Sequence, residues 1–552
     1  MATLPDLEKA QSPPLSTKDD VEKALPTEQE DKPAKNPRGG DAVAPEHLRR
    51  NLSARQVSMI AIVLVLAQGL FLGTGRALHT GGPGSLLINY SMVGALVYLV
   101  MLCLGEIATE YPQAGSFTTY SGRFVDHAFS FTIGWNYAFN DAISCAGDLT
   151  AAQVLMEYWT DRLTWLPSLF FLFFLLGINL MPVHFYGELE YWLSILKVLS
   201  VVIFFFLGIA VNAGGNTEHK YIGGQYWTHG AAPFVDGFGG FAKLFVSAAF
   251  AYGGTESLGV TAGETKNPIR NIPRVTRSVF WRILIFYIST VIIIGFNVPY
   301  DYPNLSTKST ATSPFTLVFQ QAGSKAGGSF MNAVILTSVL SAGNHAMFAG
   351  ARVLYGLAVI RQAPSIFRRT NAQGVPWVSV LAISSVSLLF FGASFLPGGA
   401  GQIWTWAQNL VGVSNQLAWL CIGVASFRFR LAWKKQGRTA EQLRYPNPLG
   451  VYGGLVIIVA TTFIILVQGW TVFRGTFSGV DFVANYIELP IFAGLYLFWR
   501  LLKGVRMPSL SQIDLDSGRY IQTEEDEVDD LVRAEREKGR MGWAWRMYGW
   551  VA

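Results

Sequence analysis

Long apolar runs separated by short polar connections dominate the chain from Val57 onward. Each run is close to the roughly 20 residues that a helix needs to cross about 30 Å of hydrocarbon. The runs lack the short alternating pattern of barrel strands, and backbone groups that face lipid must bond within their own segment. The pattern therefore predicts an all-α polytopic membrane protein with about twelve transmembrane helices. The predicted spans are residues 57–79, 84–107, 128–158, 165–182, 190–211, 238–262, 279–299, 328–359, 374–396, 402–427, 449–473 and 480–503.

Two polar stretches flank this apolar region. Residues 1–56 are rich in Pro, Lys, Glu and Asp, and they lack the apolar core of a cleaved signal peptide. We interpret them as a disordered cytosolic N-terminal tail, residues 57–503 as the transmembrane domain, and residues 504–552 as a cytosolic C-terminal tail. The composition agrees, because only 14% of the residues are charged, against roughly a quarter in soluble domains. All three cysteines lie inside apolar stretches, so we expect no extracellular disulfide framework.

Lys and Arg are divided unevenly between the connections. The even-numbered connections hold most of them, for example Arg123, Arg274 and Arg438. Cytosolic loops carry such an excess, so both termini are predicted to be cytosolic. Asn304, in the tripeptide Asn304-Leu305-Ser306, then lies in an external loop as a candidate glycosylation acceptor, although this tripeptide is common by chance.

Two of the predicted helices contain clusters of glycine. Segment one has three glycines within residues 69–75, and segment six has Gly253-Gly254 between Tyr252 and Thr255. Glycine weakens a helix by about 0.8–1 kcal/mol relative to Ala, so winding stops there at low cost. Two matched breaks, five segments apart, are typical of transporters built from inverted repeats, whose half-helix ends hold the substrate near the middle of the membrane. We therefore predict a five-plus-five inverted repeat with broken helices one and six, plus two extra helices. The alternative is that these glycines only allow close helix packing.

Glu256 lies directly after the second glycine cluster. An ionisable side chain at the middle of the membrane costs about 2.5–3.5 kcal/mol, so it rarely lacks a function. Glu256 is a candidate gate, substrate contact or proton carrier. The alternative is a structural carboxylate that bonds to neighbouring helices.

Polar residues also interrupt segments three and five. In segment three, Asn140, Asp141 and Asp148 lie in an otherwise apolar helix, and the two aspartates share one face because they are seven residues apart. A polar stripe of this kind points inward, and Asn140 and Asp148 are candidate substrate contacts. In segment five, Lys197 is a candidate proton-coupling residue, because a desolvated lysine can alternate between charged and neutral forms. The alternative is that Lys197 extends to the cytosolic interface, since the helix is predicted to begin near residue 190.

Motifs of enzymes are missing from the sequence. It has no His-Glu-x-x-His, no Gly-x-Ser-x-Gly and no nucleotide-binding Gly-x-x-x-x-Gly-Lys-[Ser/Thr] motif. We expect no catalytic residues, no cofactor, no bound metal and no nucleic acid partner. Without a nucleotide site, uphill transport has to use an ion gradient, and no repeated pore loop or charged ring indicates a channel.

Several stretches of the sequence form recognisable motifs: residues 105–112 (Gly-Glu-Ile-Ala-Thr-Glu-Tyr-Pro), 134–137 (Gly-Trp-Asn-Tyr), 253–256 (Gly-Gly-Thr-Glu), 262–268 (Ala-Gly-Glu-Thr-Lys-Asn-Pro), 332–343 and 514–519 (Asp-Leu-Asp-Ser-Gly-Arg). In these stretches the sequence resembles the fungal amino acid permeases of the amino acid-polyamine-organocation superfamily. The resemblance covers about residues 53–520.

The resemblance implies a fold of twelve helices and proton-driven uptake of amino acids across the plasma membrane. It places the substrate carboxylate at the break of segment one, around Ala67, Gln68 and Gly69. The substrate amino group would meet the groups at residues 252–256 of segment six, together with segment one. Lys197 matches a lysine associated with proton coupling, and Asp148 stands where the family usually has Glu. The family also implies that ubiquitination machinery acts on the tails.

The sequence departs from the family pattern before Gly69. Val63 to Gln68 replace a run that is usually rich in glycine, so the first half-helix should stay wound further, and Cβ atoms crowd the expected carboxylate site. Gln68 is a replacement donor for that carboxylate; an altered ligand or an impaired site are the other interpretations. The leading hypothesis is a proton-coupled permease that works by alternating access. The alternatives are a non-transporting amino acid receptor on the same scaffold and a polytopic membrane enzyme with a novel site.

Overall fold

The computed structural model describes residues 69–113, 115–160, 162–257, 267–303, 305, 313–396, 399–474, 477–522, 524, 526 and 527. These residues all belong to one compact unit, residues 48–552. Ala67, Gln68 and Asn304 lie outside the described residues, as does the predicted N-terminal tail.

Every regular element in the described part of the chain is a helix, as the hydropathy pattern predicts. Each predicted segment contains at least one helix. The α-helices are α3 Thr74–Glu110, α4 Ser116–Phe124, α5 His127–Met156, α6 Trp165–Leu180, α7 Val183–Asn212, α8 Gly237–Tyr252, α9 Pro268–Arg282, α10 Ser289–Asn297, α11 Pro314–Gln321, α12 Lys325–Val359, α13 Trp377–Gly392, α14 Gly399–Lys435, α15 Val451–Val467, α16 Gly479–Tyr486 and α17 Glu488–Lys503. Two π-helices, η2 Gly69–Gly73 and η5 Ile283–Ile288, precede α3 and α10.

Among the described residues, six helical stretches are long and apolar enough to cross a membrane, and a seventh is the pair α16 and α17, which is bent by 48°. The helices α6 and α15 are apolar but shorter. Large hydrophobic side chains such as Phe170, Trp192 and Leu389 are exposed on the outside of the bundle. An exposed apolar belt of this kind suits contact with lipid, so the chain is an all-α polytopic membrane protein.

Segments one and two are two helices that meet at a sharp kink inside α3. Gly82 has φ 77° and ψ 172°, and Pro83 follows it inside α3. Only glycine adopts this backbone conformation readily. The loop before α8 closes the kink, because Gly84 N donates to the Pro233 carbonyl (3.0 Å) and Val235 N donates to the Gly81 carbonyl (3.0 Å). The kink takes the place of the connection expected between the two predicted spans.

Two predicted helix starts are wrong. Segment five begins at Val183 and not near residue 190, so Lys197 lies in the middle of α7. Segment seven begins at Pro268 and not at residue 279. In both cases charged residues lower the hydropathy of the first turns, for example Glu190 in α7 and Arg274 in α9. Hydropathy marks the part of a helix that lies in hydrocarbon and not the whole helix.

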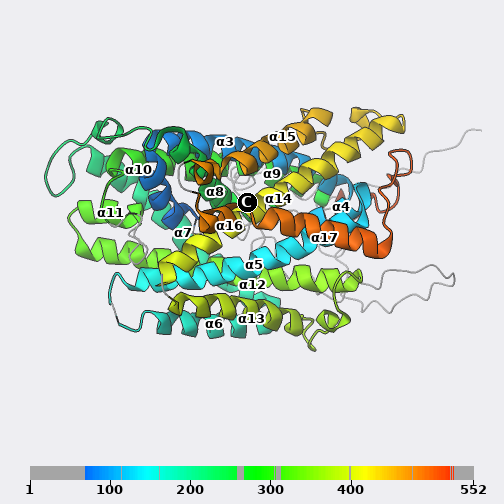
Figure 1. Ribbon diagram of the computed structural model, residues 1–552, viewed down its shortest axis with the longest axis horizontal. Coiled ribbons are helices and arrows are strands. Elements are labelled where there is room, and N and C mark those ends of the chain that lie inside the picture. The colour runs from blue at the N-terminus through cyan, green and yellow to red at the C-terminus, as the bar shows by residue number, and fades with distance from the viewer. Residues whose placement is uncertain are drawn as a thin grey trace, which may run out of the picture. The chain divides into compact units, whose positions relative to one another are not determined.

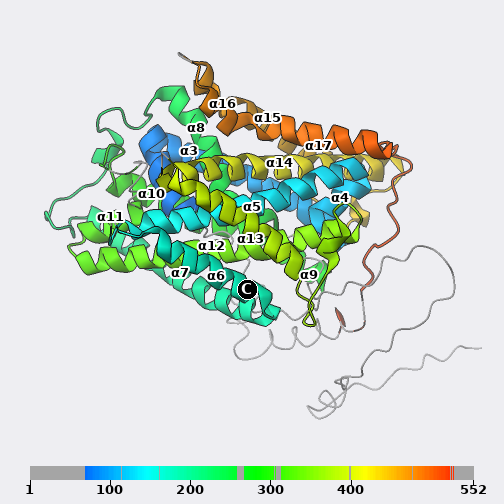
Figure 2. The ribbon, with the colours of Figure 1, turned by 60° about the horizontal axis from the view of Figure 1, so that its bottom comes forward.

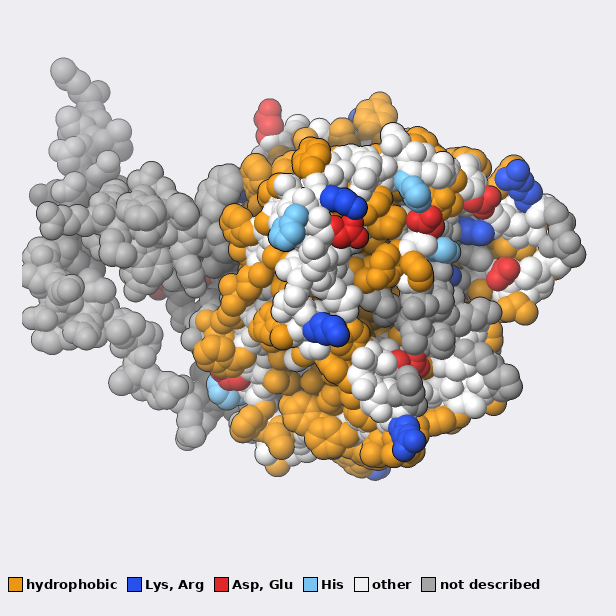
Figure 3. Space-filling model, turned by 90° about the vertical axis from the view of Figure 1, so that its left-hand side faces the viewer, with side chains coloured by type: hydrophobic (Ala, Val, Ile, Leu, Met, Phe, Trp, Pro, Cys, Tyr) orange, Lys and Arg blue, Asp and Glu red, His pale blue; other side chains and the backbone are white. Residues whose placement is uncertain are grey.

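The long helices run side by side, with α5 at the centre of the bundle (Figures 1 and 2). α5 packs against α12, α13 and α14, and α3 packs against α8 and α9. α4 lies at one end of the bundle, and α10 and α11 lie at the opposite end (Figures 1 and 2). Figure 3 shows this second end, where separate charged and histidine side chains lie among hydrophobic ones.

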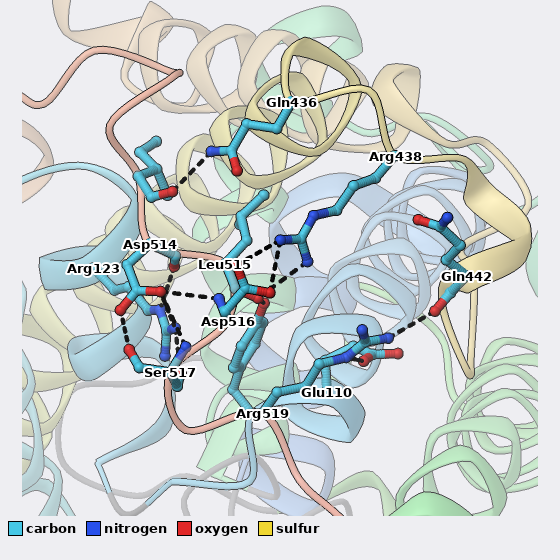
Figure 4. Close-up of polar contacts among 12 residues, drawn as sticks. Glu110, Arg123, Gln436, Arg438, Gln442, Asp514, Leu515, Asp516, Ser517 and Arg519 are labelled. Atoms are coloured by element: carbon cyan, nitrogen blue, oxygen red, sulfur yellow. Dashed lines mark hydrogen bonds and ion pairs between the residues drawn. The ribbon is translucent and has the colours of Figure 1, made fainter.

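The beginning of the C-terminal tail is bound to the helix ends beside α4. Arg438 donates to both oxygens of Asp516 (2.7 and 2.8 Å), and Arg519 pairs with Glu110 (2.7 Å) (Figure 4). Arg123 donates to the Asp514 carbonyl (3.0 Å). Hydrogen bonds from Ser517 and Asp516, with the nearby Arg123 guanidinium, lower the pKa of Asp514 to about 2. These contacts connect the tail to both α3 and the end of α14.

We predict that Arg438→Asp loosens the tail, because it replaces a bidentate attraction to Asp516 with repulsion. Exposed ion pairs contribute about 0.2–1 kcal/mol, so proteinase K should cut residues 504–522 about 1.4- to 5-fold faster in the variant. Lys435→Asp, at an exposed position on the same helix end, is the control and should leave the rate unchanged. The double variant Arg438→Asp/Asp516→Arg should restore slow cleavage; no rescue would contradict the role given to this pair.

Candidate functional site

The helix of segment six breaks at its two glycines, as the sequence predicts. α8 ends at Tyr252, Gly253 and Gly254 form a turn, and Thr255 begins a short 3-10 turn. Gly254 has φ 84°, a conformation that favours glycine. A Cβ atom at Gly253 would overlap the side-chain amide of Asn415 on α14. Both glycines are therefore required, one for its dihedral angle and the other for a close approach.

The described part of segment one is wound, contrary to the expectation of an unwound stretch. Gly69–Gly73 form the π-helix η2, which continues directly into α3. A π-helix is a looser winding that often occurs at functional positions. Side-chain hydroxyls bind two of its carbonyl groups: Thr74 Oγ1 donates to Leu70 O (2.7 Å), and Ser313 Oγ donates to Phe71 O (2.6 Å). The wound state agrees with the loss of the usual glycines before residue 69.

Segments one and six meet backbone to backbone. A Cβ atom at Gly69 would lie too close to the backbone of Ala251, in the last turn of α8. Two buried tyrosines bind the nearby carbonyl groups: Tyr287 OH donates to Ala251 O (2.6 Å), and Tyr252 OH donates to Tyr90 O (2.9 Å). The two glycine-containing segments therefore lie together, as the inverted-repeat hypothesis requires.

Glu256 is fully buried at the break of α8 and bonds to three groups. Tyr137 OH donates to Oε1 (3.1 Å), Trp419 Nε1 donates to Oε2 (3.2 Å), and the Gly254 amide donates to Oε1 (3.3 Å). These partners come from α5, α14 and the break itself. The carboxylate thus connects the broken helix to its neighbours, an arrangement compatible with both the functional and the structural interpretations.

Asn140 lies in the same region. Its Nδ2 donates to Asn415 Oδ1 (3.0 Å), and Asn415 Nδ2 donates to the Ala249 carbonyl in α8 (3.3 Å). Thr255 Oγ1 binds locally, to the Tyr252 carbonyl (2.5 Å). The predicted residues Asn140, Tyr252, Thr255 and Glu256, with the two glycines, therefore form one cluster around the end of α8, which we call the break cluster.

Asp141 lies beside the break cluster with unused hydrogen-bonding capacity. The residue is 7% exposed, and its charge interacts with that of Glu256. Its Oδ2 has no hydrogen-bond partner among the described residues. Gly350 of α12 lets the aspartate fit, because a Cβ atom there would be 2.8 Å from Asp141 Cβ. A buried carboxylate oxygen without a partner is costly, so a cation or a donor is expected there when the protein works.

Asp148 belongs to a different cluster. It lies against Gly343 of α12, and its charge interacts with Lys197 and not with the break cluster. Neither of its carboxylate oxygens has a hydrogen-bond partner in the described part of the chain. The structure therefore separates Asp148 from Asn140, although both are predicted to contact the substrate.

Lys197 is fully buried and does not extend to the interface. Its Nζ donates to Ser341 Oγ of α12 (2.8 Å). Ser341 Oγ donates in turn to Glu190 Oε2 (2.5 Å), and Asn344 Nδ2 donates to Glu190 Oε1 (2.7 Å). We call these four residues and Asp148 the lysine cluster. It joins α5, α7 and α12.

Sequence reasoning missed several members of both clusters. The spacing of Glu190 is such a signal, since it lies seven residues before Lys197 and therefore on the same helical face. A predicted helix start near residue 190 hides this relation, because it places Glu190 at the end of the helix. The only sequence signal for Asn415 and Trp419 is that each places a polar group in the apolar helix α14. In the described part of the chain, no three His, Cys, Asp or Glu side chains gather as metal ligands.

Comparison with known proteins identifies similar chains. A sequence profile described as "Amino acid permease" matches residues 56–512. A probable amino-acid permease of Schizosaccharomyces pombe is 41% identical over 86% of this chain and 96% of its own length. The lysine-specific permease of Escherichia coli is 38% identical over 84% of this chain and 96% of its own. Cationic amino acid transporter 1 of S. pombe is 35% identical over 92% and 87%. A solved manganese transporter of Eremococcus coleocola is similar over 81% and 94%, with a TM-score of 0.48 and 14% identity.

We predict that Gly69→Ala destabilises the protein, because the added methyl group forces the backbones of segments one and six apart. Overpacking of this kind costs about 1–3 kcal/mol, so the midpoint of thermal unfolding should fall. Gly356→Ala is the control: its Cβ meets nothing within 4 Å, and Ala is slightly more stable than Gly in a helix. Equal midpoints for the two variants, measured in detergent, would show that the close contact is not needed.

Proposed function

Because this chain belongs to the amino acid permease family, we propose that it takes up amino acids across the plasma membrane by proton symport and alternating access. The family is one of multi-pass membrane transporters and not of enzymes. The excess of Lys and Arg in the even-numbered connections supports a cytosolic location of both termini. On this view Asn304 faces outward, and the tails are accessible to ubiquitination machinery.

One observation carries the proposal: the broken end of α8 lies against η2 with a buried carboxylate beside it. Glu256 and the backbone around Gly253 can bind a substrate amino group, since carboxylate and carbonyl oxygens accept hydrogen bonds from an ammonium. The substrate carboxylate would bind at the start of segment one, to Gly69 and the preceding Ala67 and Gln68. The broken end of α8 has free backbone groups suited to one charged end of an amino acid, as half-helix ends do in transporters.

The preferred substrates are amino acids with a basic side chain. Asp141 supports this choice, because its unpartnered Oδ2 is buried near the charge of Glu256. Two carboxylates in a low-dielectric site repel each other and favour the binding of additional positive charge. Two relatives have names that refer to lysine or to cationic amino acids, in agreement with this electrostatic argument.

The coupling proton is carried by Lys197. Its burial and its single bond to a neutral hydroxyl among the described contacts suit a group that gains and loses a proton. Glu256 is the second candidate, at the substrate. Because the lysine cluster joins α5, α7 and α12, a change of charge at Lys197 acts on helices that alternating access must move.

The test is uptake of all twenty radiolabelled amino acids, at two external pH values, by a permease-deficient host that expresses the chain. Accumulation of lysine and arginine that increases at acid pH supports the proposal. Binding without flux would instead indicate the receptor alternative, and conversion of the ligand into a new product would indicate an enzyme.

We predict that Glu256→Gln strongly lowers accumulation without loss of surface protein, and that Lys197→Ala does the same. Hydrogen bonds to a charged group contribute about 1.5–3 kcal/mol, which corresponds to a loss of about 10- to 150-fold. Surface biotinylation and uptake are measured on the same cells. Uptake by both variants at the rate of the unmodified protein would refute the roles given to these residues.

We also predict that Asp141→Asn weakens the uptake of basic amino acids and not that of neutral ones. Loss of one partner of a buried charge pair costs about 2–5 kcal/mol, so the KM for lysine should rise by about tenfold or more. Asp301→Asn, at an exposed position, is the control. If the KM for lysine stays unchanged in Asp141→Asn, the basic side chain binds elsewhere.

A further inference from the structure

The proposed function leaves Glu190 without a role, although it is one of the most deeply buried acidic residues described. Glu190 lies in α7 and is 1% exposed. Burial of an unpaired carboxylate in the membrane is costly, so such a residue needs partners or a function. Its two oxygens bond to Ser341 and Asn344, both of α12.

A continuous chain of hydrogen bonds connects Lys197 to Glu190. Lys197 Nζ lies 2.8 Å from Ser341 Oγ, and Ser341 Oγ lies 2.5 Å from Glu190 Oε2. Ser341 therefore accepts from the ammonium and donates to the carboxylate at the same time. A hydroxyl is one of the few side-chain groups that can do both, because it has one proton and two lone pairs.

Asn344 holds the carboxylate in position for this contact. Its Nδ2 donates to Glu190 Oε1 (2.7 Å), and its Oδ1 accepts from Asn179 Nδ2 of α6 (2.8 Å). The Asn179 amide also donates to the Leu175 carbonyl (2.9 Å). This second chain of bonds fixes the carboxylate so that Oε2 is directed to Ser341.

Other titratable and charged groups surround the chain of bonds. Asp148 of α5 faces Lys197. Three more groups lie near Lys197 and Glu190: His345 and Arg352 of α12, and Tyr186 of α7. Tyr186 OH lies 2.9 Å from His345 Nδ1. None of these groups lies between Lys197 and Glu190 in the bonded chain, where Ser341 is the only bridging residue described.

We propose that Ser341 relays a proton from Lys197 to Glu190, which makes Glu190 a further proton-accepting residue of the transporter. In the step, one N–H bond of the Lys197 ammonium breaks and its proton bonds to Ser341 Oγ. The Ser341 O–H bond breaks at the same time, and that proton bonds to Glu190 Oε2. The products are a neutral amine, an unchanged hydroxyl and a carboxylic acid, so atoms and charge balance.

The relay has a physical reason in the cost of buried charge. Two opposite charges inside a membrane protein lose their hydration, and their mutual attraction repays this only with good geometry. Transfer of one proton removes both charges and leaves the pair neutral, and the titration then belongs to the pair and not to one residue. The pair can thus hold the coupling proton on Lys197, as an ion pair, or on Glu190, as a neutral pair, while α7 and α12 move.

This inference rests on the proposed proton symport. The experiment distinguishes failure of the relay from failure of the symport. The purified full-length chain in liposomes is given radiolabelled L-lysine in two assays. The first measures accumulation driven by an imposed proton gradient. The second measures exchange with internal unlabelled lysine without a gradient, which needs binding and helix movement but no net proton transfer.

Ser341→Ala should lower proton-driven accumulation by about tenfold or more, because the link between the two groups is lost, while exchange stays within about twofold. Ser341→Thr is the matched control, since it keeps the hydroxyl, and it should retain both activities. Glu190→Gln should keep exchange and lose the dependence of accumulation on external pH.

Three outcomes would overturn the relay. Full accumulation by Ser341→Ala shows that the hydroxyl is not needed. Equal loss of accumulation and exchange in Ser341→Ala and Glu190→Gln shows a structural contact between α7 and α12. If the unmodified protein exchanges lysine but never accumulates it with a proton gradient, the proposed symport itself fails, and the relay fails with it.

Discussion

The end of α8 is the feature on which the rest of the site depends, because a helix broken inside a membrane leaves polar groups that only protein can satisfy. Gly253 and Gly254 make the break possible, and the groups around it are then bound by other helices. Asn415 reaches the Ala249 carbonyl, and Tyr287 reaches the Ala251 carbonyl. The break therefore fixes where α14 and the π-helix η5 must lie.

The central position of α5 follows from the same constraint. Its polar side chains would be costly against lipid, so the helix is surrounded by α12, α13 and α14. Tyr137 contacts the break cluster, Asn140 belongs to it, and Asp148 belongs to the lysine cluster. One helix thus carries contacts to both clusters, and the glycines of α12 let it come close. A movement of α5 against α12 would change the surroundings of the break cluster and the lysine cluster together.

The contacts of the C-terminal tail lie outside the membrane, where the cost of a charge is much lower than inside it. Outside the hydrocarbon, charges keep much of their hydration, and each exposed pair adds little. Several pairs and backbone contacts nevertheless hold one short segment to both α3 and α14, including Tyr111 OH, which donates to Leu515 O (2.8 Å). Residues 514–519, near the start of the C-terminal tail, are therefore part of the folded unit. Their composition alone indicates only a polar tail.

The sequence by itself determined the helical class, the positions of the apolar segments, the break at Gly253 and Gly254, and the presence of a buried acid at Glu256. These features are local: hydropathy, glycine and charge act on the segment that contains them. The tertiary structure alone decided that Lys197 lies in mid-helix, that Asp148 belongs with it and not with Asn140, and that Glu190 and Ser341 complete its cluster. These pairings join residues far apart in the chain. Hydropathy records whether a side chain tolerates lipid, but not which polar group on another helix will satisfy it, because that depends on the register and rotation of packed helices.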